Sequence, residues 1–172
     1  MDARLENRLI STMFGARLVN NAFRGTLVEA ILAQVLEPEW RWCSGDWASH
    51  DFENADGVKL EVKQSAALQS WHTEGFAPNR GRFDIAKRKV RWDGAKRIDG
   101  GGRYANLYIF AWHPVIDPDL ADHRQPDQWL FHLLRTDDLP DQRSIALSRL
   151  QALSPAIDLG AVPALIAALL RS

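Results

Sequence analysis

Residues 50–63 read His-Asp-Phe-Glu-Asn-Ala-Asp-Gly-Val-Lys-Leu-Glu-Val-Lys, and this stretch predicts a β-hairpin. Residues 55–57 fit a three-residue loop in which Gly57 takes the left-handed position after a type I turn. A shorter loop at residues 56–57 would mix polar and apolar side chains on both faces. The longer loop separates them: Phe52, Val58, Leu60 and Val62 fall on one face, and Asp51, Glu53, Lys59, Glu61 and Lys63 on the other.

Two acidic side chains meet across this predicted hairpin. The register places Glu53 opposite Lys59, an ordinary ion pair, but it places Asp51 opposite Glu61. Like charges in directly opposed positions are destabilising. The two acids therefore need a shared proton, neutralisation by Lys63, or a cation between them. Mg²⁺ prefers carboxylate oxygens and completes its shell with water and phosphate oxygen. The stretch predicts either a metal site or a solvated face on which Lys63 balances the acids.

The order of these residues resembles a known family. Asp51 followed by Glu61-Val62-Lys63 resembles the signature of the PD-(D/E)XK nuclease superfamily, in which an acid on one strand precedes Glu-x-Lys on the next. An apolar helix with Glu29 upstream and the small-residue segment 64–71 downstream extend the resemblance over roughly residues 22–112. His50 stands where the family commonly has proline.

The resemblance implies a role for each of these residues. Asp51 and Glu61 would bind the metal, Mg²⁺ with Mn²⁺ as a substitute, and the backbone carbonyl of Val62 would be a further ligand. Lys63 would assist the attacking water. Glu29 would be an accessory catalytic contact to metal or water.

The resemblance also implies a fold and a function. The fold would be α/β and restriction-endonuclease-like, with a central mixed β-sheet flanked by helices and an α-β-β-β-α-β core. The function would be Mg²⁺-dependent endonucleolytic hydrolysis of DNA. The alternatives are a catalytically inactive nucleic-acid-binding or assembly module of the same fold, and an ordinary interaction domain with a solvated hairpin face. Many duplex cutters of this superfamily work as homodimers, and residues 1–20 would be a helix or a dimer arm.

Positive charge is concentrated downstream of the hairpin. The whole chain carries a net charge of −1, but residues 80–103 contain nine basic residues against three acidic ones. Such a segment suits a phosphate backbone, although a solvated basic loop has the same composition. The predicted DNA contacts are Arg80, Arg82, Lys87, Arg88, Lys89, Arg91, Lys96, Arg97 and Arg103, together with Gln69.

Helices are expected on both sides of the hairpin. Upstream, Thr26 fits an N-cap with Glu29 three residues on, so Glu29 has capping its own helix as an alternative role. Downstream, residues 65–71 resemble the start of a helix, on which Gln69 would face substrate or solvent. Trp71 is expected in the core, with stacking on a base as the alternative.

The remaining pattern places strands at Trp40–Trp47, Tyr104–Trp112 and Gln128–Arg135 and closing helices at 144–153 and 161–170. Residues 72–103 are expected to be mostly loop, with 100–102 as a flexible glycine connection.

Length and composition indicate one cytoplasmic domain. The 172 residues would form a single nuclease-like unit: an arm (1–20), a catalytic core (22–112) and a C-terminal strand and helices (113–172). The lone cysteine, Cys43, excludes an internal disulfide, suits a reducing compartment and is expected in the core. The start lacks an apolar signal core, and no apolar run is long enough to span a bilayer, so no membrane partner is expected. The five histidines show no metal-ligand spacing.

Overall fold

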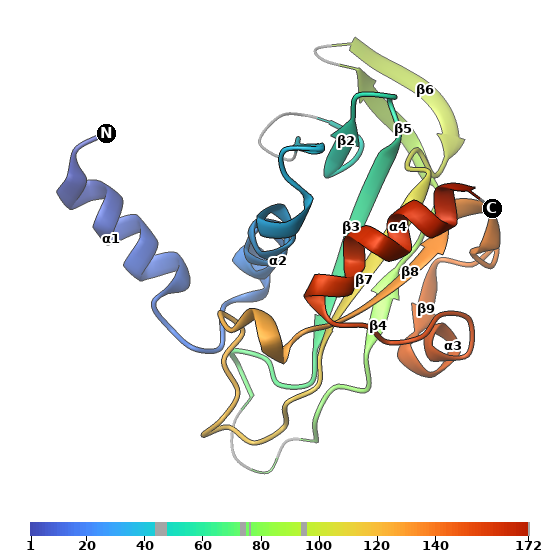
Figure 1. The fold of residues 1–172 in the computed structure, drawn as a ribbon. Coiled ribbons are helices and arrows are strands. Elements are labelled where there is room, and N and C mark those ends of the chain that lie inside the picture. The colour runs from blue at the N-terminus through green and yellow to red at the C-terminus, as the bar shows by residue number, and fades with distance from the viewer. Residues whose placement is uncertain (44–47, 73–74, 76, 94–95, 172) are drawn as a thin grey trace.

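The computed structural model of the chain describes residues 1–43, 48–72, 75, 77–93 and 96–171, with the backbone alone for residues 91–93 and 96 (Figure 1). Its helices are α1 (Ala3–Phe14), α2 (Asn21–Leu36), α3 (Leu147–Gln151) and α4 (Val162–Arg171), with short 3-10 turns at Pro126–Gln128, Thr136–Asp138 and Leu159–Ala161. Its strands are β1 (Trp40–Trp42), β2 (Phe52–Asn54), β3 (Lys59–Ala66), β4 (Arg82–Asp84), β5 (Arg88–Asp93), β6 (Lys96–Gly102), β7 (Leu107–His113), β8 (Leu130–Arg135) and β9 (Ser144–Ala146).

A mixed five-stranded sheet forms the centre of the fold, as the sequence predicts for an α/β protein. Its strand order is β1-β2-β3-β7-β8, in which β3 and β7 are parallel and all other neighbours are antiparallel. Helices α2 and α4 pack on one face. The two-stranded sheet β4-β9 and the short helix α3 cover the other face (Figure 1).

Strand β7 is buried along its whole length and supplies side chains to two hydrophobic cores. Leu107, Ile109 and Ala111 face α2 and α4, whereas Tyr108, Phe110 and Trp112 face β4-β9 and α3. This arrangement explains the continuous apolar run that predicts a buried strand here, because both faces of the strand are covered.

The hairpin register is confirmed in its central part. Phe52 pairs with Leu60 and Glu53 with Lys59, while Gly57 has φ of 75° at the end of the loop. The prediction that Asp51 lies directly opposite Glu61 is wrong. The amide of Asp51 donates to the carbonyl of Leu60 at 2.9 Å, so the ladder slips at this residue and the regular rungs end at Phe52.

Helix α2 begins earlier than the sequence suggests. Its N-cap is Asn20, whose side-chain oxygen accepts from the amide of Ala22 at 2.9 Å, and Thr26 lies inside the helix. The predicted capping box of Thr26 and Glu29 is therefore wrong. An Asn cap satisfies an otherwise unpaired amide of the first turn. The stability that it contributes outweighs the low helix propensity of the glycine at position 25.

This correction gives opposite expectations for two alanine substitutions. Asn20→Ala is expected to lower the free energy of unfolding by about 1 kcal/mol, because the first turn loses its cap. Thr26→Ala is expected to be neutral or slightly stabilising, because alanine is the better helix former at an exposed interior position. Urea unfolding of both variants measures the difference. A loss of stability in Thr26→Ala without one in Asn20→Ala would instead support the predicted helix start at Thr26.

The connection between the parallel strands β3 and β7 also differs from the prediction. Residues 65–71 do not start a helix, because β3 continues to Ala66 in pairing with His113 of β7 and residues 67–71 form a turn. The predicted loop 72–103 contains β4 and the hairpin β5-β6, and the glycines 100–102 lie in β6. Strand β1 covers the first part of Trp40–Trp47, and residues 44–47 lie outside the described residues.

At the N-terminus, α1 has no buried residue and exposes Leu5, Leu9 and Ile10. It extends away from the sheet in Figure 1, and a role as a dimer arm stays a prediction. Within the described part of the chain, none of the helices combines the length and the apolar character that crossing a membrane requires.

Candidate functional site

Asp51 lies at the edge of β3, where β2 no longer covers it. Its carbonyl accepts from the amide of Cys43 at 2.8 Å, and its carboxylate oxygen Oδ2 accepts from the amide of Val62 at 2.6 Å. The carboxylate oxygen therefore accepts the hydrogen bond that a backbone carbonyl of a neighbouring strand would otherwise accept from Val62. The amide and carbonyl of one strand residue point to the same edge, so the carbonyl of Val62 also faces this side.

Three acidic side chains act on one another at this edge. Burial, followed by the charges of Glu61 and Glu29, raises the pKa of Asp51 to about 7. The hydrogen bond from Val62 and the charge of Lys63 oppose this shift. The structure thus brings together all four predicted side chains, although Asp51 and Glu61 do not face each other across a regular rung. A carboxyl with this environment has a strong preference for a proton or a metal cation.

Glu61 and Lys63 project from β3 on the face that carries Tyr108 and Phe110. The Lys63 ammonium donates to Oε1 of Glu61, and both side chains remain partly exposed, at 18% and 15% for Lys63 and Glu61. Burial and the charge of Glu61 raise the pKa of Tyr108 to about 12, so its hydroxyl stays protonated next to them. The pair lies at the rim of a covered sheet face, where it stays partly accessible to water.

Glu29 is held in place by the first strand. Its Oε2 accepts from the indole nitrogen of Trp42 at 3.0 Å. Because helix α2 starts at Asn21, Glu29 does not cap its own helix. Its charge acts on Asp51, and an accessory role toward metal or water stays a prediction.

A second group of metal-ligand types lies close by. Donor atoms of Cys43, His50 and Glu53 all lie within 4.8 Å of one another, and the structure brings His50 Nε2 to 3.5 Å from Glu53 Oε2. Within the described residues neither ring nitrogen of the buried His50 has a hydrogen-bond partner. The spacing of the histidines in the sequence gives no sign of this group, because its other members are a cysteine and a glutamate. Sulfur and imidazole ligands suit zinc and not Mg²⁺, whereas Asp51 and Glu61 offer only oxygen. Cys43 itself is buried, as predicted.

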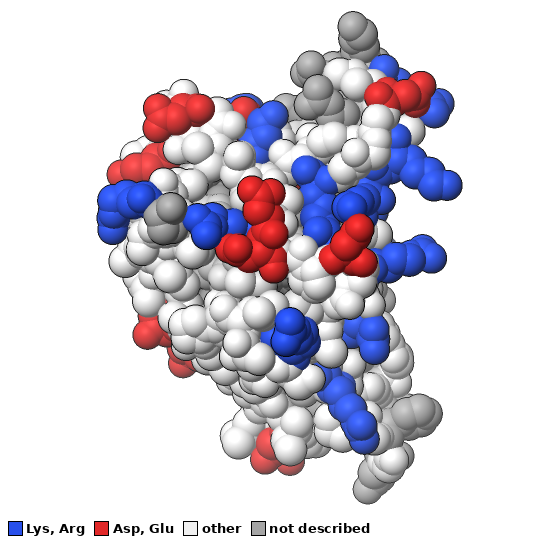
Figure 2. Space-filling model, turned by 90° about the vertical axis from the view of Figure 1, so that its right-hand side faces the viewer, with Lys and Arg blue, Asp and Glu red and all other residues white. Residues whose placement is uncertain are grey.

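The predicted basic residues form an exposed surface around the β5-β6 hairpin and β4. Figure 2 shows Lys and Arg side chains gathered in the upper half of this face. Arg80 and Lys89 are exposed; Lys87 pairs with Asp141 at 2.8 Å, Arg88 with Asp84 at 3.5 Å and Arg97 with Asp99 at 3.2 Å. Exposed ion pairs of this kind contribute little stability.

Three of the predicted DNA-contacting residues are not part of this described surface. Arg103 donates to the backbone carbonyls of Ile85, Leu139, Pro140 and Gln142, at 2.7 to 3.4 Å, so it ties loops together instead of facing solvent. The side chains of Arg91 and Lys96 lie outside the described residues.

The structure adds Arg24, which the sequence analysis missed. This arginine is 2% exposed and donates to Gln64 at 2.6 Å, Gln69 at 2.8 Å and Asn21 at 2.8 Å. Gln69 is buried and not exposed, with its amide nitrogen on the carbonyl of Ala66. The signal was present in the sequence: Arg24 precedes Val28 by four residues and Ile31 by seven, on the buried stripe of α2.

Comparisons with known proteins found no match. No protein-family model, no curated protein and no solved structure matches the chain.

Proposed function

We propose that this protein is a Mg²⁺-dependent endonuclease of the restriction-endonuclease-like fold that hydrolyses DNA phosphodiester bonds. The observation that carries the proposal is the environment of Asp51: a half-buried carboxyl next to two further acids and Lys63 at an open strand edge. A structural ion pair would neutralise such a carboxyl with a basic hydrogen-bond partner. Here its acceptor contact is a backbone amide, and the charge of Lys63 offsets only part of the effect of burial and the two acids.

The donor set suits a hard divalent cation. Asp51 and Glu61 would supply two carboxylates and Val62 one carbonyl, which matches the few protein ligands that Mg²⁺ takes. The metal, when bound, supplies a more acidic water and positive charge next to the developing phosphorane. Glu29 would help to hold the ion or a neighbouring water molecule from the helix side.

Lys63 has a separate role. Its ammonium is anchored by Glu61, so it is oriented toward the position where water would attack, and it adds positive charge against the phosphate. The exposed basic residues around β4 and β5-β6 would hold the phosphate backbone by charge, which makes binding strongly dependent on salt.

The proposed family relationship accounts for the core but not for every element. The helix α2, the hairpin β2-β3 and the parallel strand β7 follow the predicted order, whereas the crossover carries β4 and β5-β6 where a helix was expected. The catalytic positions precede this crossover in the chain, so the departure lies downstream of the proposed metal ligands.

A cleavage assay with defined metals tests the proposal. Supercoiled plasmid, linear duplex, flap and junction substrates are incubated with the full chain in Mg²⁺, Mn²⁺, Ca²⁺ or EDTA. We expect cleavage of at least one substrate in Mg²⁺ and Mn²⁺, and none in Ca²⁺ or EDTA. Cleavage that persists in EDTA, or none in any metal, would contradict the proposal.

Metal titration separates the inactive alternative. A catalytically inactive module would bind DNA with a steep salt dependence but would bind neither Mg²⁺ nor Mn²⁺. Calorimetric titration of the protein with each metal, next to DNA binding at two salt concentrations, distinguishes this outcome from an active nuclease.

A further inference from the structure

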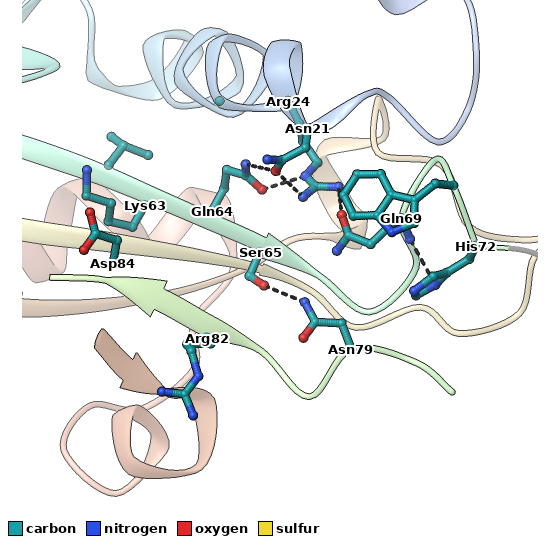
Figure 3. Close-up of a pocket in the computed structure, with 13 residues that line it drawn as sticks. Asn21, Arg24, Lys63, Gln64, Ser65, Gln69, His72, Asn79, Arg82 and Asp84 are labelled. Carbon is teal, nitrogen blue, oxygen red and sulfur yellow. Dashed lines mark hydrogen bonds between the residues drawn. The ribbon is translucent and has the colours of Figure 1, made fainter. Parts of the chain in front are cut away.

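A cavity of about 620 Å³ opens next to Lys63, between the first turns of α2 and the C-terminal half of β3. Figure 3 shows Arg24, Gln64 and Gln69 joined by hydrogen bonds on one side of it, with Ser65 and Asn79 on the other. The volume lies in the range of sites that hold a small organic molecule. A lone phosphate group would leave most of it to water.

The charge of the cavity favours an anion. Arg24 donates to three uncharged side-chain oxygens, and it forms no ion pair with any described acidic residue. Burial lowers the pKa of Arg24 to about 10, which leaves it protonated at neutral pH. Lys63 and Arg82 also line the cavity, against Asp84 as the acid among its described lining residues. An uncompensated buried cation is costly, and a bound anion would offset that cost.

An exposed aromatic ring completes the cavity wall. Trp71 lines the cavity and is 59% exposed, although a tryptophan at this position was expected in the core. An exposed indole next to positive charge is the usual platform for a nucleobase, because any base can stack on it.

The neutral groups of the cavity are already ordered. Asn79 donates to the hydroxyl of Ser65 at 3.1 Å and to the carbonyl of Ala66 at 3.2 Å, and Gln64 donates to Asn21 at 3.0 Å. The guanidinium of Arg24 retains N–H groups beyond the three that these contacts use. The cavity thus combines a rigid polar floor, donors for a phosphate and a ring for a base.

We propose that the cavity receives one unpaired nucleotide of the DNA strand next to the cleavage site, with its base on Trp71 and its phosphate toward Arg24, Lys63 and Arg82. This inference rests on the proposed nuclease function and adds a substrate class to it. A paired base cannot enter a cavity of this size without leaving its stack, which costs a few kcal/mol. DNA with a bulge, a flap or a junction supplies an unpaired nucleotide without that cost.

The experiment measures binding and not cleavage. The full chain is titrated, in EDTA and separately in Ca²⁺, with a paired duplex and with the same duplex carrying one unpaired nucleotide. We expect binding of the second DNA to be at least about tenfold tighter, from the energy of stacking one base. Trp71→Ala should remove most of this preference, and Trp71→Phe should keep most of it. A mononucleotide, dAMP, should compete in the wild type and not in Trp71→Ala.

Charge is tested by a matched pair of arginine variants. Arg24→Gln should weaken binding of the unpaired nucleotide by about tenfold, as expected for one lost charge-assisted contact, whereas Arg171→Gln, at an exposed position of α4 outside the cavity lining, should not. Since Arg24 is buried, the melting of Arg24→Gln is checked by circular dichroism. Trp71 is exposed, so its variants keep the test valid if Arg24→Gln does not fold.

Several results would overturn the cavity proposal. Equal affinity for paired and bulged DNA, no binding in either buffer, or an unchanged preference in Trp71→Ala would each do so. Metal-dependent cleavage would then still support the nuclease. A preference for the unpaired nucleotide without any cleavage would instead support the cavity and contradict the nuclease.

Discussion

Lys63→Ala is expected to lower the rate of Mg²⁺-dependent DNA cleavage by about 100- to 1,000-fold, the usual effect of removing a group that positions or activates a nucleophile. Lys63 lies on β3 next to Glu61, lines the cavity and stays 18% exposed, so its ammonium can reach both water and phosphate. It is not a metal ligand in the proposed site. Mg²⁺ affinity, measured by calorimetric titration, should therefore stay near the wild-type value while the single-turnover rate falls.

Lys59 provides the matched control for this variant. It lies four residues earlier on the same strand and the same face, but it pairs with Glu53 in the ladder. Lys59→Ala should retain cleavage close to the wild-type rate. Equal losses in the two variants would mean that the strand contributes only general positive charge, and no loss in either would place the chemistry elsewhere.

Local sequence signals were sufficient for the hairpin. Gly57 and the alternation of apolar and polar residues gave the loop and the rungs at Phe52–Leu60 and Glu53–Lys59, because turn chemistry and strand period act over a few residues. The slip at Asp51 was not predictable in this way. It depends on the carbonyl of Asp51 bonding the amide of Cys43, a contact that requires β1 to be in place.

Contacts that are distant in sequence explain the other differences. Residues 65–66 were expected to start a helix but continue β3, because strand 107–113 pairs alongside them. Trp71 is exposed because the turn after β3 carries it to the cavity and not into either core. Arg24 was missed because the assumed N-cap at Thr26 started the helix more than one turn too late, and this left Arg24 outside it. Tertiary pairing overrode local propensity in the first case, and an error in one helix boundary concealed a site residue in the last.

Asp51→Asn is expected to be more stable than the wild-type protein above neutral pH when metal is absent. Burial and the acids nearby raise the pKa of Asp51 to about 7 in the folded chain, against 3.8 as the ordinary value. Below pH 4 the carboxyl is protonated in both folded and unfolded states, so this source of destabilisation is absent. Between pH 4 and pH 7 the unfolded chain releases its proton first, and the folded state loses stability as pH rises.

The size of this effect follows from the shift in pKa. A difference of about three pH units corresponds to roughly 4 kcal/mol between pH 4 and pH 8, taken as an upper value. Asparagine cannot ionise, but its side-chain oxygen can still accept from the amide of Val62, so the variant keeps the strand-edge contact. The stability difference between Asp51→Asn and wild type should therefore grow steadily with pH across this window.

Urea unfolding of Asp51→Asn and of the wild type in EDTA at pH 4.5, 6 and 8 measures this growth. Saturating Mg²⁺ at pH 8 should stabilise the wild type by holding Asp51 ionised and should stabilise Asp51→Asn much less. A pH-independent difference between Asp51→Asn and wild type would show that Asp51 has an ordinary pKa, and the main argument for a cation at this edge would fail.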